Sequence, residues 1–127
     1  DKIRTEENVI PMHVKIKQDS NPIFIWGCGT LAIQVFHFCR KYQIDIKGSF
    51  VNIETDQAYF EDLPVYNLKD LMIRYSKFSV IVGISDYEFD CCFSLILRNS
   101  KYRKYILLIK RLLRSNRMHF LRLYGEE

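Results

Sequence analysis

The sequence predicts an α/β domain in which a parallel β-sheet of about five strands has helices on both faces. Three observations lead to this fold class. The chain has 127 residues, of which 48% are hydrophobic and 27% charged, as is typical of one globular domain. Apolar runs of strand length alternate with segments of helical periodicity. Helices that connect successive strands form right-handed crossovers, which give a parallel sheet covered on each face.

Short runs rich in β-branched and aromatic residues predict the strands. Runs that are apolar throughout, such as IFIW and FSVIVGI, are typical of strands buried on both faces of a sheet. Pro64 places its segment at the start or at the edge of the sheet, because proline donates no ladder hydrogen bond. The predicted strands are residues 23–26, 44–53, 63–66, 78–84 and 102–109. We expect these five in the order 3-2-1-4-5, as in a doubly wound sheet.

Apolar residues at helical spacing predict the helices between the strands. After the first strand, Leu31 and Val35 fall at positions i and i+4 of one helix face. Asn67 is a suitable N-cap for the next helix, and Ser85 or Asp86 for the one after it. The predicted helices are residues 31–42, 68–76, 87–98 and 110–124.

The strongest local motif is Gly27-x-Gly29-x-x-Ala32, which lies between the first strand and the first helix. It fits the G-x-G-x-x-G/A fingerprint of dinucleotide-binding turns and indicates a Rossmann-like three-layer α/β/α sandwich. The first glycine allows a tight turn, the second lets a phosphate approach the backbone, and the small third residue lets the helix pack closely. Backbone N–H groups of Gly29 and Thr30, at the helix N-terminus, would then hold the phosphate. The alternative is a tight turn that binds nothing.

The second half of the fingerprint is incomplete. An acidic residue is expected at the end of the second strand, where it binds a ribose hydroxyl, but Asn52 stands there. Asn52 offers an uncharged hydrogen bond, and Glu54 and Asp56 follow as substitutes. A conventional NAD-dependent dehydrogenase is therefore the weaker hypothesis. Ser85 follows the fourth strand, so it either faces Gly29 across the switch point of the sheet or serves only as an N-cap.

Motifs for catalysis and for metal binding are missing from the sequence. The four cysteines form neither C-x-x-C nor a zinc-spaced cluster with the three histidines, so we expect reduced, cytoplasmic thiols and no metal site. Cys28 lies at a helix N-terminus, which can activate a thiol, but without a nearby base we interpret it as a small residue of the turn. The chain contains neither G-x-S-x-G nor a P-loop lysine, so no catalytic residue is assigned.

Charge is distributed unevenly along the chain. Residues 1–100 carry 11 Lys and Arg against 13 Asp and Glu, whereas residues 101–127 carry 8 against 2. A basic amphipathic segment can bind nucleic acid or an acidic membrane. We interpret residues 110–127 instead as a helical connector to a further domain, with residues 1–20 as an N-terminal extension and residues 21–109 as the binding domain. No apolar run reaches the roughly 18–20 residues that span a bilayer.

Three runs of the sequence resemble a known layout. IFIWGCGTLAIQVFHFCRKYQIDIKGSFVN, FEDLPVYNLKDL and FSVIVGIS, within residues 22–85, are similar to Rossmann-like domains of bacterial sugar-modifying enzymes in surface-polysaccharide pathways. Two groups share the pattern: the N-terminal domain of PglD-type sugar acyltransferases and the domain preceding FkbM-type methyltransferases. The resemblance implies a nucleotide loop at Gly27, Gly29 and Thr30. It also implies that Asn52 replaces an Asp of those families.

The resemblance implies a module that binds a nucleotide, NAD(P) or a nucleotide-sugar within a larger sugar-modifying or methyl-transferring enzyme. The hexapeptide repeats and catalytic His of the acyltransferases are absent from this chain, as is the S-adenosylmethionine motif of the methyltransferases. Two alternatives stay open. One is an NAD(P)-linked oxidoreductase domain, and the other is a ligand-free scaffold for interaction or homodimerisation.

Overall fold

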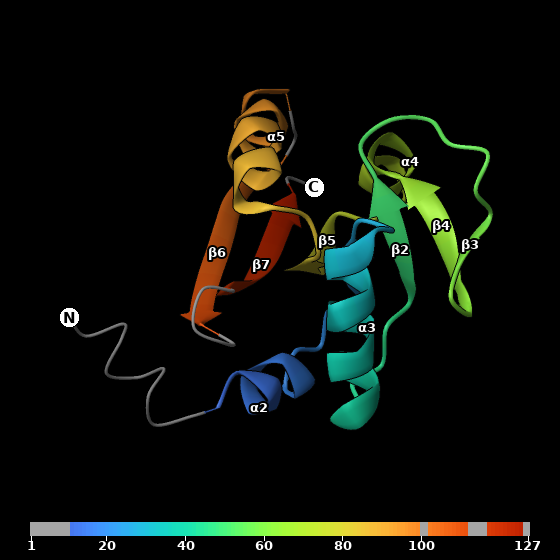
Figure 1. The fold of residues 1–127 in the computed structure, drawn as a ribbon. Helices are drawn as coiled ribbons and strands as arrows, with labels where there is room; N and C mark the ends of the chain where they lie inside the picture. The colour runs from blue at the N-terminus through green and yellow to red at the C-terminus, as the bar shows by residue number, and fades with distance from the viewer. Residues whose placement is uncertain (1–10, 100–101, 112–116, 126–127) are drawn as a thin grey trace.

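The computed structural model describes residues 11–99, 102–111 and 117–125, which form an α/β fold around one mixed sheet (Figure 1). The sheet order is β3-β4-β2-β1-β5-β7-β6. The strands are β1 (Ile23–Trp26), β2 (Gly48–Val51), β3 (Tyr59–Phe60), β4 (Leu63–Asn67), β5 (Lys77–Val82), β6 (Tyr102–Arg111) and β7 (Arg117–Gly125). The helices are α2 (Met12–Lys17), α3 (Thr30–Lys41), α4 (Leu68–Arg74) and α5 (Asp86–Asn99).

The centre of the sheet is parallel. β1 pairs in parallel with β2 on one side and with β5 on the other, and β2 pairs in parallel with β4. This arrangement confirms the predicted order for the first four expected strands. All four residues of β1 are buried, as its continuous apolar run indicates.

The edge of the sheet beyond β5 differs from the prediction of five parallel strands in the order 3-2-1-4-5. β7 pairs with β5 in antiparallel fashion, and β6 lies outside β7 as the other arm of a hairpin. The helix predicted within the connector of residues 110–127 is therefore wrong for its described part, since Arg117–Gly125 is a strand. The role of these residues as a connector to a further domain stays a prediction. The open edge of β5 presents main-chain groups that need partners, and a hairpin provides them.

Part of the expected N-terminal extension is a packed helix. Met12–Lys17, within the expected extension of residues 1–20, forms α2. Met12 and Ile16 lie one helical turn apart on this helix, and both are buried in the core. Residues 1–10 lie outside the described part of the chain.

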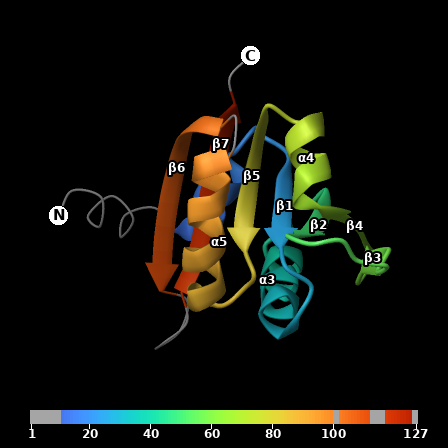
Figure 2. The same ribbon diagram turned by 90° about the horizontal axis from the view of Figure 1, so that it is seen from above.

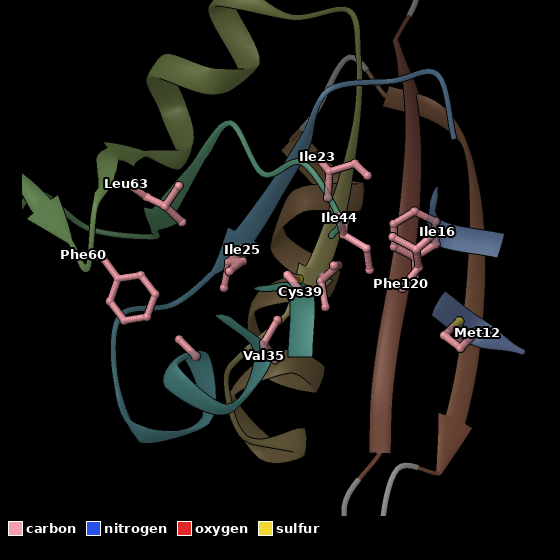
Figure 3. Packing of buried hydrophobic residues seen from close by; sticks show 12 residues of the cluster. Met12, Ile16, Ile23, Ile25, Val35, Cys39, Ile44, Phe60, Leu63 and Phe120 are labelled. Carbon is pink, nitrogen blue, oxygen red and sulfur yellow. The ribbon is translucent and has the colours of Figure 1, made fainter. Parts of the chain in front are cut away.

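Two apolar clusters, one on each face of the sheet, give the molecule three layers (Figures 1 and 2). The cluster on the face that α2 and α3 cover includes residues of these helices and of the sheet. It consists of Met12, Ile16, Ile23, Ile25, Ala32, Val35, Cys39, Ile44, Phe60, Leu63, Ile81 and Phe120 (Figure 3). Under α4 and α5 lie Phe24, Trp26, Phe50, Leu71, Phe78, Val80, Val82, Phe89 and Leu121. Alternate residues of a strand point to opposite faces, so β1 and β7 each contribute to both clusters.

Candidate functional site

A groove of about 450 Å³ lies at the carboxyl ends of β1, β2 and β5. In Figure 2 the arrowheads of β1 and β5 point toward this edge. α3 leaves β1 on one face of the sheet and α5 leaves β5 on the other, so the groove opens at the topological switch point. Its volume is in the range of small-molecule sites. It is lined by Trp26, Gly27, Cys28, Gly29, Thr30, Leu31, Val51, Asn52, Ile53, Gly83, Ile84, Ser85 and Glu88.

The groove brings together six of the seven residues that the sequence singled out for binding: Gly27, Cys28, Gly29, Thr30, Asn52 and Ser85. Glu54 is the exception, because it lines a separate depression with Asp56, Tyr66 and Asp70. β2 ends at Val51, and the chain then turns toward β4, which carries the Glu54 side chain away from the glycine turn. Glu54 is therefore not among the described residues that line the groove, and its role toward a ribose hydroxyl stays a prediction.

Gly27 is required by the backbone of the turn. Its φ is +117°, and a Cβ at this position would lie 2.7 Å from the carbonyl oxygen of Gly83. The Gly27 N–H donates to the carbonyl oxygen of Phe50 at 2.8 Å, which joins the turn to β2. Gly83 was not predicted, and a Cβ there would lie 2.8 Å from the Cα of Ala32. Two glycines and one alanine thus allow α3 to pack closely against the strand ends.

Gly29 differs from Gly27, because packing does not require it. A Cβ at Gly29 would meet no atom within 4 Å. Gly29 is the N-cap of α3 without a side chain to cap it, and the first turn of α3 carries no acidic residue. The approach to the helix N-terminus is therefore open and has the partial positive charge of the helix dipole.

Cys28 points toward the sheet through a hydrogen bond with Ser49. The buried Ser49 hydroxyl donates to the carbonyl oxygen of Gly27 at 2.7 Å, and the Cys28 Sγ lies 3.1 Å from the same hydroxyl oxygen. Since the Ser49 proton is used, the Cys28 thiol is the donor in this second bond. These contacts favour the structural interpretation of Cys28. Ser49 gave no signal in the sequence, because a serine inside an apolar strand resembles an ordinary strand residue.

Asn52 and Ser85 make contacts to α5. The Asn52 Nδ2 donates to the Cys92 Sγ at 2.8 Å. The Ser85 Oγ accepts from the Glu88 backbone N–H at 3.2 Å, which confirms Ser85 as an N-cap of α5. Desolvation raises the pKa of the Cys92 thiol, and the neighbouring Cys91 and Glu88 add to that increase.

Glu88 is the charged residue among those that line the groove, and sequence reasoning missed it. Acidic residues in the first turn of a helix suit the helix dipole, so Glu88 gave no separate signal of a binding role. No lysine, arginine or histidine is among the described lining residues, so the positive potential there comes from the N-terminus of α3.

The described residues include four free cysteines, of which Cys39 is buried. Burial raises the pKa of the Cys39 thiol to about 12, so this thiol stays neutral. The described part of the chain contains no group of three or more His, Cys, Asp or Glu able to hold a metal ion. Its helices include none long and apolar enough to cross a membrane.

No family model matches this chain, and neither a curated protein nor a solved structure matches it significantly. The fold and the groove define a class: an α/β domain with a mostly parallel sheet and a groove at the carboxyl ends of its central strands.

Proposed function

We propose that this chain is a Rossmann-like module that binds a nucleotide or nucleotide-sugar in the groove at the N-terminus of α3. The observation that carries the proposal is Gly29, whose missing side chain faces open space at an uncapped helix N-terminus. A glycine that packing does not require suggests that a ligand needs the room. The backbone N–H groups of Gly29 and Thr30 would hold a phosphate.

The rest of the groove suits the remainder of such a ligand. Leu31 and Ile53 are exposed apolar side chains on its rim, with Ile53 76% exposed, and they offer an apolar surface to a planar base. Asn52 lies at the end of β2, where a ribose hydroxyl is expected, and its carbonyl oxygen can accept from that hydroxyl.

The wider context of this proposal comes from the sequence resemblance. It favours a cytoplasmic sugar-modifying or methyl-transferring enzyme of surface-polysaccharide synthesis, in which this module binds and a further domain carries out the reaction. We assign no catalytic residue to the described part of the chain. The oxidoreductase hypothesis is weaker, because the lining residues that the structure describes include no Tyr–Lys pair to act as a general acid.

A thermal-shift panel tests the binding proposal. The ligands are NAD(H), NADP(H), UDP-sugars, CDP-linked compounds and S-adenosylmethionine. A ligand at 100 times its dissociation constant should stabilise the protein by about 2.7 kcal/mol and raise the unfolding midpoint by several degrees. A panel that leaves the midpoint unchanged would reject nucleotide binding in favour of the ligand-free scaffold.

Gly29→Val is expected to abolish binding of the active ligand while the protein stays folded. The branched side chain would fill the space in front of the α3 N-terminus but meet no neighbour within 4 Å at its Cβ. Gly29→Ala adds one methyl group and should give a smaller loss of affinity. Titration calorimetry of both variants, with unfolding midpoints measured without ligand, checks this order. Unchanged affinity of the folded Val variant would show that the site lies elsewhere.

A further inference from the structure

Glu88 brings a full negative charge into the groove, which the glycine turn on the same groove lacks. It lies in the first turn of α5, and its side chain is exposed. The bond from its N–H to the Ser85 Oγ fixes the turn that carries it. The ion pairs found among the described residues do not include Glu88. Its carboxylate is therefore available to a ligand.

Glu88 and Asn52 belong to the same wall of the groove. Cys92 follows Glu88 by one helical turn, so the two side chains are neighbours on the surface of α5. Asn52 reaches the same place from the end of β2, because its Nδ2 donates to the Cys92 Sγ at 2.8 Å. The negative charge of Glu88 also contributes to the raised pKa of the Cys92 thiol. The Glu88 carboxylate thus belongs to the same wall as Asn52. Asn52 is the position at the end of β2 where the fingerprint expects an acidic residue and this sequence has none.

The chemistry of this wall suits hydroxyl groups and disfavours a phosphate. A carboxylate accepts hydrogen bonds from two hydroxyls of a diol, and these charge-assisted bonds are stronger than those to an amide oxygen. A phosphate in the same place would face the Glu88 charge. No lysine or arginine among the described lining residues would offset that repulsion.

We propose that Glu88 binds the ribose hydroxyls of the ligand, in the role that an acidic residue at the end of β2 would otherwise have, and so selects ligands without a 2′-phosphate. This inference rests on the proposed nucleotide binding. It assigns the ligand to the class of nucleotides with a free ribose diol.

Two ligand pairs that differ at the ribose 2′ position test this assignment: NADH with NADPH, and UDP-glucose with dUDP-glucose. Titration calorimetry is run on the wild-type chain, Glu88→Gln, Glu88→Asp and Asp90→Asn. The wild type should bind the free-diol member of a pair at least tenfold more tightly. Glu88→Gln should weaken that binding about tenfold and remove most of the preference. Glu88→Asp keeps the charge and should retain part of the preference.

Asp90→Asn is the matched control, because Asp90 is an exposed carboxylate on the same helix that does not line the groove. It should bind like the wild type. If Glu88→Gln keeps the wild-type affinity and preference while Gly29→Val loses binding, the nucleotide site stands and the role of Glu88 is overturned. If the wild type binds none of these four ligands and none of the thermal-shift panel, both proposals are overturned.

Discussion

Gly27→Ala is expected to lower the free energy of unfolding by about 3 kcal/mol or more. Two costs add at this position. The φ of +117° disfavours any side chain, and the new Cβ would lie 2.7 Å from the Gly83 carbonyl oxygen. That oxygen belongs to backbone and cannot rotate away as a flexible side chain would. Urea unfolding followed by circular dichroism measures the difference through the transition midpoint.

The same substitution two residues along the turn provides the control. Gly29→Ala places a Cβ where no atom lies within 4 Å, at an N-cap with negative φ. The expected loss of stability is at most about 1 kcal/mol, the usual cost of alanine at an N-cap. Equal losses in the two variants would contradict the distinction between a glycine needed for the turn and a glycine that leaves room for a ligand.

Asp19→Ala is expected to cost about 3 kcal/mol of stability. The Asp19 side chain is 5% exposed, and its Oδ2 accepts from the Arg122 Nε at 3.2 Å. Its two oxygens also accept from the Ser79 hydroxyl and from the Asn21 backbone N–H. Alanine would leave Arg122, whose side chain is 25% exposed, with its charge uncompensated beside the sheet. Because Arg122 belongs to β7 and Ser79 to β5, the contact between these strands should weaken most.

Asp62→Ala is the control, because it removes a solvent-exposed ion pair in place of a buried one. Asp62 accepts from Arg40, and both side chains are more than half exposed. Exposed pairs contribute roughly 0–1 kcal/mol, so this variant should unfold close to the wild type. Amide hydrogen exchange of the two variants adds a spatial readout. Loss of protection in β7 for Asp19→Ala, and not for Asp62→Ala, is the expected pattern. Uniform loss in both variants would refute the proposed link between Asp19 and β7.

The elements predicted well are those whose cause is local. The apolar run of β1 predicted a strand buried on both faces, and all four of its residues are buried. Asn67 predicted the start of α4, where its Oδ1 accepts from the Asp70 N–H at 2.9 Å. Gly27 and Ala32 predicted the turn and the close approach of α3.

The elements predicted badly depend on distant partners. Residues 117–125 carry a spacing of apolar and basic residues that a helix also satisfies, and only the open edge of β5 selects a strand there. Phe120 packs in the core cluster under α2 and α3, whereas its neighbour Leu121 packs in the cluster under α4 and α5 on the other face of the sheet. A helix on one face of the sheet could not bury both.

The residues of the candidate site also fall into those that local sequence predicts and those that depend on distant partners. The sequence alone determined the glycine turn, the parallel strands around it and six of the thirteen groove residues, because turn geometry and strand burial follow from neighbouring residues. Only the tertiary structure decided which carboxylate enters the groove. Glu54 follows Asn52 closely in the chain but turns toward β4, whereas Glu88 comes from α5, 36 positions after Asn52. Pairing of β1 with β5 brings the start of α5 beside the end of β2, and no local pattern encodes that contact.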